Sequence, residues 1–187
     1  MSALPAKHLF TAEDFAVMTD SGLFADDDRI ELLRGEIFEM SPVGQRHAAC
    51  VRRLTNLLAR RLGESAVVDA QNPLRLNELS QPQPDLVVLQ PRDDFYADAH
   101  PGPEDVLVLI EVADSSLAYD RDLKIPLYAR SAVPEVWLVD LEAQAVEIYR
   151  DPGPDGYRVN ERITEPTAEL RSTNLPRLAL RLEAVLG

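Results

Sequence analysis

Two acidic residues lie beside strongly apolar segments, where charged side chains are unusual. Asp85 comes directly before the run Leu-Val-Val-Leu at 86–89, and Glu111 follows the apolar run at 106–110, 26 residues after Asp85. Runs this apolar are typical of strands that are covered on both faces of a sheet. An unpaired carboxylate in such a strand is costly unless it is neutralised, paired or bound to a metal ion. The two acids therefore predict a shared divalent cation.

Lys124 follows Glu111 by 13 residues and supplies a positive charge that can reach the same point. Two acids and a lysine on neighbouring elements suit the hydrolysis of a phosphodiester, which needs a deprotonated water, stabilised charge on the phosphate and a neutralised leaving oxygen. Mg²⁺ provides all three and prefers oxygen ligands with few protein carboxylates. We expect Mg²⁺, with Mn²⁺ as a substitute, to bind Asp85, Glu111 and the main-chain carbonyl of Val112. Lys124 would then hold the attacking water and stabilise developing negative charge.

The length of 187 residues fits one α/β domain that spans residues 1–187. No apolar stretch approaches the roughly 18 residues of a membrane span. The N-terminus also lacks the basic-then-apolar layout of a signal peptide. We therefore expect a cytoplasmic protein without a membrane segment. The single cysteine, Cys50, lies in a helical pattern and is expected to pack as a small hydrophobe.

The net charge of −13, with a pI near 4.6, argues against nucleic-acid binding, because proteins that track phosphates usually carry a basic patch. Much of the excess comes from acids in segments that read as loops, such as 26–28 and 93–94. These are interpreted as solvated charges. A metal site can still attract phosphate locally.

The hydrophobic pattern predicts a mixed sheet with a few helices. Helical spacing occurs at 11–22 and 45–62, and a third helix within 115–130 must accommodate Pro126 in its first turn or as a kink. A long surface loop covers 90–105. Strands are expected at 29–33, 36–40, 67–70, 74–76, 85–89, 106–112, 135–140, 145–149 and 157–163.

Several motifs follow one another in a fixed order along most of residues 10–182. They are the segment 31–42, Pro84-Asp85, Glu111-Val112, Tyr119 to Lys124, and 133–140. In this order they resemble the Uma-type family of predicted restriction endonucleases, a branch of the PD-(D/E)XK nuclease superfamily. The resemblance implies an α/β (α+β) restriction endonuclease-like core and a metal-dependent endonuclease activity on DNA.

The lysine of the motif stands in an unusual place. The general signature has it two residues after the second acid, and that position is Ala113 here. In the Uma-type branch the matching lysine lies on the following helix, at Lys124. Glu31 matches a further acid of the family, which implies either a metal ligand acting through water or a surface residue.

Two more residues have open interpretations. His47 lies four residues before Val51 on the apolar side of its helix, and is either a site histidine or a half-buried structural one. Tyr128 lies one helical turn beyond Lys124 and either orients that lysine or a phosphate, or packs in the core.

Our leading hypothesis is a Mg²⁺-dependent DNA endonuclease with Asp85, Glu111, Lys124 and Glu31 in its site. The rival is a catalytically inactive nuclease-fold module for binding or assembly, and a third possibility is a metal-dependent hydrolase of another phosphate ester. Nucleases of this kind often act as homodimers, because two sites are needed to cut two strands. The apolar run at 175–186 could help such pairing.

Overall fold

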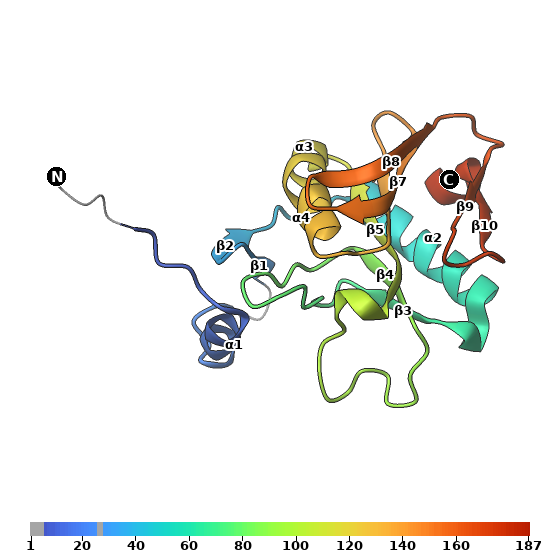
Figure 1. Ribbon diagram of the computed structural model, residues 1–187. Helices are drawn as coiled ribbons and strands as arrows, with labels where there is room; N and C mark the ends of the chain where they lie inside the picture. Colours follow the sequence, from blue (N-terminus) through green and yellow to red (C-terminus); the bar gives the residue numbers. More distant parts are fainter. Residues whose placement is uncertain (1–5, 26–27) are drawn as a thin grey trace.

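The computed structural model describes residues 6–25 and 28–187. Its centre is a six-stranded sheet in the order β3-β4-β5-β6-β7-β8, in which β5 and β6 are parallel and the other neighbours are antiparallel (Figure 1). The strands are β1 (Ile30–Leu33), β2 (Glu36–Glu39), β3 (Val67–Ala70), β4 (Leu86–Leu89), β5 (Val106–Ala113), β6 (Glu135–Asp140), β7 (Ala145–Gly153), β8 (Gly156–Ile163), β9 (Glu169–Arg171) and β10 (Ala179–Arg181). The helices are α1 (Ala12–Asp20), α2 (Gln45–Leu62), α3 (Leu117–Tyr119), α4 (Ile125–Arg130) and α5 (Leu182–Leu186), with 3-10 turns at Gly63–Ser65 and Pro103–Asp105 and a π-helical turn at Asp120–Lys124.

Helices cover both faces of the central sheet. Successive residues of a strand point to opposite sides, so each strand contributes side chains to both cores. One face of β5, with Ile110 and Val112, packs against α2 and α5. The other face, with Leu109 and Ala113, packs against α4. This arrangement confirms the predicted mixed sheet flanked by helices, and it explains why β5 reads as an unbroken apolar run.

A hairpin of β1 and β2 lies beside the sheet. Arg34 and Gly35 both have positive φ, at 54° and 76°, as a two-residue turn between right-twisted strands requires. A Cβ atom at position 35 would come within 2.6 Å of the Cβ of Leu9, so this turn also needs the small residue. The amide of Gln81 donates to the carbonyl of Leu32 at 2.7 Å. This bond fixes the hairpin beside the segment that leads into Asp85.

The segment 74–76 is not a strand, contrary to the alternation of its residues. Leu74 and Leu76 are buried in the core, and their amides donate to the carbonyls of Pro82 and Ser80 at 2.9 and 3.0 Å. Pro82 has no N–H with which to return a bond to Leu74, so this contact with 80–82 does not become a regular ladder. The β7–β8 hairpin is also longer than expected, since β7 continues to Gly153.

The apolar C-terminal run is used inside the chain. Leu178, Leu180, Leu182 and Val185 are at most 1% exposed and belong to the core on the α2 side. The interpretation that this run helps two copies to pair is therefore wrong, because its side chains are already covered.

Cys50 is buried as expected, and burial raises its pKa to about 11. Asp26 and Asp27, interpreted above as solvated, lie outside the described residues. No helix in 6–25 or 28–187 is long and apolar enough to cross a membrane.

Candidate active site

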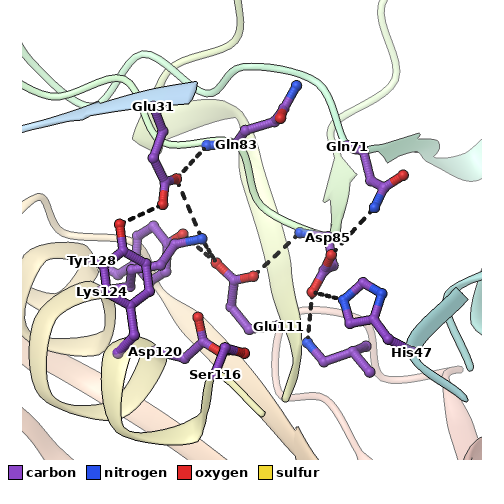
Figure 2. A network of polar contacts seen from close by, with 12 residues as sticks. Glu31, His47, Gln71, Gln83, Asp85, Glu111, Ser116, Asp120, Lys124 and Tyr128 are labelled. Atoms are coloured by element: carbon purple, nitrogen blue, oxygen red, sulfur yellow. Dashed lines mark hydrogen bonds and ion pairs between the residues drawn. The ribbon is translucent and has the colours of Figure 1, made fainter. Parts of the chain in front are cut away.

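Asp85 and Glu111 face each other at the point where β4 begins. Leu86 pairs with Ile110 in antiparallel register, so the next pair outward is Asp85 and Glu111. The amide of Val112 donates to Oδ2 of Asp85 at 2.9 Å, and the amide of Asp85 faces Oε2 of Glu111 at 3.3 Å (Figure 2). The two acids predicted from the sequence are therefore brought together at one end of the sheet.

Pro84 explains why the ladder ends here. The same register would place Pro84 opposite Val112, and a regular pair would exchange both amide and carbonyl bonds. Proline has no N–H, so it cannot bond the main-chain carbonyl of Val112. The amide of Val112 is instead satisfied by the side chain of Asp85. The proline–aspartate pair thus removes a main-chain partner and supplies a carboxylate in its place.

Lys124 is buried between two carboxylates. Its Nζ lies 2.7 Å from Oε1 of Glu111 and 3.4 Å from Oε2 of Glu31, and its side chain is 3% exposed. Burial alone would lower the pKa of Lys124, but Glu111, Glu31 and Asp120 together hold it well above its ordinary value. Burial also raises the pKa of Glu111, against the attraction of Lys124. The lysine is therefore a fixed ammonium group.

A π-helical turn carries Lys124 to this position. In Asp120–Lys124 the helix widens, and the amide of Ile125 donates to the carbonyl of Asp120, five residues back. Pro126 follows directly and would clash with a carbonyl in a regular helix. The wider turn lets the chain continue as a helix through α4, so Pro126 does not break the segment. Such turns are frequent at functional sites.

Glu31 is fully buried, so the interpretation as a surface residue is wrong. The hydroxyl of Tyr119 donates to its Oε1 at 2.8 Å, and the amide of Gln83 donates to its Oε2 at 2.9 Å. With Lys124 beside Oε2, both oxygens are engaged. Glu31 therefore connects the β1–β2 hairpin to the lysine.

His47 reaches Asp85 from α2. Its Nε2 lies 2.9 Å from Oδ2 of Asp85, whereas its Nδ1 is buried without a hydrogen-bond partner among the described residues. Burial raises the pKa of Asp85, but the hydrogen bond and charge of His47, the amide of Val112 and the charge of Lys124 outweigh it, and the pKa is lowered. Asp85 is therefore ionised, and His47 fixes one of its oxygens.

Tyr128 forms a hydrogen bond with Glu111, and within the described residues no hydrogen bond joins it to Lys124. Its hydroxyl donates to Oε1 of Glu111 at 2.5 Å, and its ring is fully buried in the core beneath α4. It does not line the cleft, so a direct contact with a phosphate is excluded in this structure. Its role is to orient Glu111, and core packing accounts for its ring.

An open cleft of about 350 Å³ lies over these groups. One wall is the segment 39–44, the other is 114–120, and Asp85, Glu111 and Lys124 line its floor. Sequence reasoning missed Gln83, whose contribution is a main-chain amide without any sequence signal. It also assigned no role to Asp120, although Asp120 lies four residues before Lys124, on the same side of a helix.

The residues at the floor fit a hydrated Mg²⁺ or Mn²⁺. Each strand acid keeps one weakly engaged oxygen, since Oδ1 of Asp85 lies 3.5 Å from Nε2 of Gln71 and Oε2 of Glu111 lies 3.3 Å from the amide of Asp85. The carbonyl of Val112 is not paired by Pro84. Across 6–25 and 28–187, no group of three or more His, Cys, Asp or Glu side chains is placed to hold a metal ion together. Mg²⁺ does not need one, because it retains several waters and takes one or two carboxylates.

Comparisons with known proteins identify the family and the fold. A sequence model of the Uma2 family, described as "Putative restriction endonuclease", matches residues 12–183. A crystal structure from Anabaena variabilis, described as a putative nuclease belonging to DUF820, superposes with a TM-score of 0.72 at 17% identity. The match covers 95% of this chain and 97% of that chain, which confirms the predicted fold. A search of curated proteins finds no match.

Proposed function

Because this chain belongs to the Uma2 family, we propose that it is a metal-dependent endonuclease that hydrolyses DNA phosphodiester bonds. The observation that carries the proposal is the pair of facing carboxylates with a buried ammonium beside them, at the floor of an open cleft. A lapsed site has no evident physical reason to keep Asp85, Glu111 and Lys124 buried together, since buried charges are costly.

The chain's own residues divide the work. Asp85, Glu111 and the carbonyl of Val112 would hold Mg²⁺ or Mn²⁺, which supplies charge stabilisation at the phosphate. Lys124 presents a positive charge next to the phosphate that enters the cleft, and Glu31 and Glu111 keep that charge in place. His47 and Tyr128 each fix one oxygen of a strand acid.

The net negative charge of the chain is unfavourable for DNA binding, but helix α2 carries a local excess of positive charge. It contains five arginines and no acidic residue, within a chain of net charge −13. Its first turn lies at the cleft, because Gly44 and His47 both line the cleft. Arg52 and Arg60 are exposed and have no hydrogen-bond or ion-pair partner within the described ranges. Arg52 and Arg60 lie on the outer side of α2, away from the buried stripe, so they would meet phosphates of a duplex that extends from the cleft along this helix.

Cleaving both strands of a duplex needs two sites, so a homodimer on DNA remains part of this proposal. The surface for pairing is not the C-terminal run, whose side chains are buried.

The test is a cleavage assay on supercoiled plasmid DNA with Mg²⁺ and, separately, Mn²⁺. The proposal expects nicked and linear products from the wild type, and none with EDTA or with Asp85→Asn. A wild type that binds DNA without cutting it would favour the inactive binding module. Hydrolysis of a small phosphodiester such as bis-p-nitrophenyl phosphate, without cleavage of DNA, would favour the third hypothesis of a different ester.

A further inference from the structure

Asp120 is a third buried carboxylate beside Lys124, in addition to Glu31 and Glu111. Its side chain lines the cleft, and the residue is 5% exposed. Oδ2 accepts a hydrogen bond from the hydroxyl of Ser116 at 2.6 Å. Oδ1 accepts no hydrogen bond from the part of the chain that the structure describes. It is also not among the fully buried polar atoms that lack a partner, so it is not sealed inside the protein. Oδ1 is therefore open to the cleft that Asp120 lines. Figure 2 shows Asp120 and Ser116 beside each other, next to Glu111.

The other groups of the site are poorly placed to accept a proton from a water molecule. Lys124 is an ammonium and forms ion pairs with two carboxylates. Both oxygens of Glu31 are engaged by Tyr119, Gln83 and Lys124.

The two strand acids each have one oxygen that is firmly engaged. Oε1 of Glu111 accepts from Tyr128 and pairs with Lys124, and Oδ2 of Asp85 is held by His47 and the amide of Val112. Their weakly engaged oxygens, Oε2 of Glu111 and Oδ1 of Asp85, are those that would hold the metal ion. Asp120 is then the carboxylate near Lys124 that has an oxygen left for the water.

We propose that Asp120 accepts the proton of the attacking water through Oδ1. This inference rests on the proposed hydrolysis of DNA. The water oxygen forms a bond to phosphorus while the bond between phosphorus and the leaving sugar oxygen breaks. The water's proton moves to Oδ1 of Asp120, and the leaving oxygen takes a proton from solvent in the open cleft. Asp120 then returns its proton to solvent.

The burial and the charged neighbours of Asp120 change its pKa. Burial raises its pKa most, Lys124 and the hydrogen bond from Ser116 lower it, and Asp85 and Glu31 raise it, so that the pKa stands at about 6. Glu111 also faces it from β5. The role itself follows from geometry, because a general base needs an acceptor oxygen that water in the cleft can reach, and Oδ1 is such an oxygen.

The test compares Asp120→Asn with Asp122→Asn. Asparagine keeps the shape of the side chain and an oxygen for Ser116, so the fold should be retained, which a thermal melt checks. Asp122 is exposed and lies two residues further along, so Asp122→Asn removes the same charge outside the cleft. Single-turnover cleavage of plasmid at saturating Mn²⁺ should be slower for Asp120→Asn by a factor on the order of 100 to 10,000. Asp122→Asn should cut at the wild-type rate.

Mn²⁺ binding, measured by calorimetry, separates a base from a ligand. The inference expects an unchanged affinity in Asp120→Asn, because Asp120 acts on the water and does not hold the metal ion. Equal cleavage by wild type and Asp120→Asn would overturn the inference alone. A loss of Mn²⁺ affinity in Asp120→Asn would overturn it too, since Asp120 would then be a ligand. A wild type that cuts no DNA with either metal would overturn the proposed function, and this inference with it.

Discussion

The ammonium of Lys124 lies 2.7 Å from Oε1 of Glu111, and both side chains are almost fully buried. The chain has only two lysines, and the other, Lys7, forms an exposed pair with Glu36 at 2.8 Å. The same ion-pair chemistry therefore occurs once in the core and once on the surface. Comparing the two lysines therefore distinguishes the large effect of a buried ion pair on the free energy of unfolding from the small effect of an exposed one.

Lys124→Met should lower the free energy of unfolding by about 3–5 kcal/mol, because it leaves Glu111 and Glu31 buried without their cation. Lys7→Met should cost less than about 1 kcal/mol, since exposed pairs contribute little. Urea denaturation at pH 7 measures both. Adding Glu31→Gln to Lys124→Met should recover part of the loss, because one unpaired buried charge is removed. Equal effects of the two lysine variants would contradict the buried ion-pair network.

His47→Ala should weaken Mn²⁺ binding by a factor of roughly 10 to 100, the usual effect of removing a residue that orients a metal ligand. The reason is that His47 holds Oδ2 of Asp85 at 2.9 Å, so its loss frees the carboxylate to rotate. Calorimetric titration with Mn²⁺ measures the change. His100→Ala, in an exposed loop, is the control and should bind as the wild type does. Wild-type affinity in His47→Ala would show that Asp85 needs no such support.

Much of this fold follows from residue spacing. Helix α2 begins and ends where the pattern predicts, since Val51, Leu54, Leu58 and Leu62 are buried on one stripe and Gly63 follows. The expected strand at 74–76 is absent because its partner segment contains Pro82, which has no N–H to complete a ladder, although Leu74 and Leu76 are buried as the alternation indicates.

The acids of the site were visible as charges in apolar strands, but their partners were less so. The amide of Gln83 contacts Glu31 through the main chain, which leaves no trace in residue type. The direction in which the Asp120 side chain points depends on the π-helical turn at Asp120–Lys124, which helical periodicity in the sequence does not reveal. Sequence patterns therefore located the charged groups, whereas their hydrogen-bond geometry required the structure.

Replacing Arg52 and Arg60 together by alanine should weaken duplex binding and make it less sensitive to salt. Each lost phosphate contact lowers the slope of log affinity against log salt by about 0.9. Fluorescence anisotropy with a labelled duplex in Ca²⁺, over a series of KCl concentrations, measures that slope. Arg130→Ala removes one exposed arginine at the end of α4 and should leave the slope unchanged. A double variant with the wild-type slope would exclude α2 from the DNA-binding surface.

Glu147 offers a test of pH-dependent stability away from the cleft. Its carboxylate is 6% exposed and accepts from Arg121 at 2.7 Å, Arg162 at 2.6 Å and the hydroxyl of Tyr149 at 2.5 Å. Burial raises its pKa, but the hydrogen bonds from Tyr149 and Arg121 outweigh that effect, and the pKa is lowered. A lowered folded-state pKa contributes stability that is present above the unfolded value, about 4.3, and is lost as the pH falls through the folded value.

Glu147→Gln should therefore be less stable than the wild type at pH 7, by about 1–3 kcal/mol for hydrogen bonds to a charged group. Its stability should also fall less steeply than that of the wild type between about pH 5 and about pH 3, because the group that takes up a proton there is gone. Urea midpoints at a series of pH values measure both effects. Glu161→Gln is the control, since Glu161 is largely exposed and its contact with Arg150 is 3.4 Å long. Parallel pH profiles for wild type and Glu147→Gln would contradict this prediction. They would mean that the arginines do not stabilise the ionised form of Glu147, and that Glu147 stabilises the β7–β8 side of the sheet through packing alone.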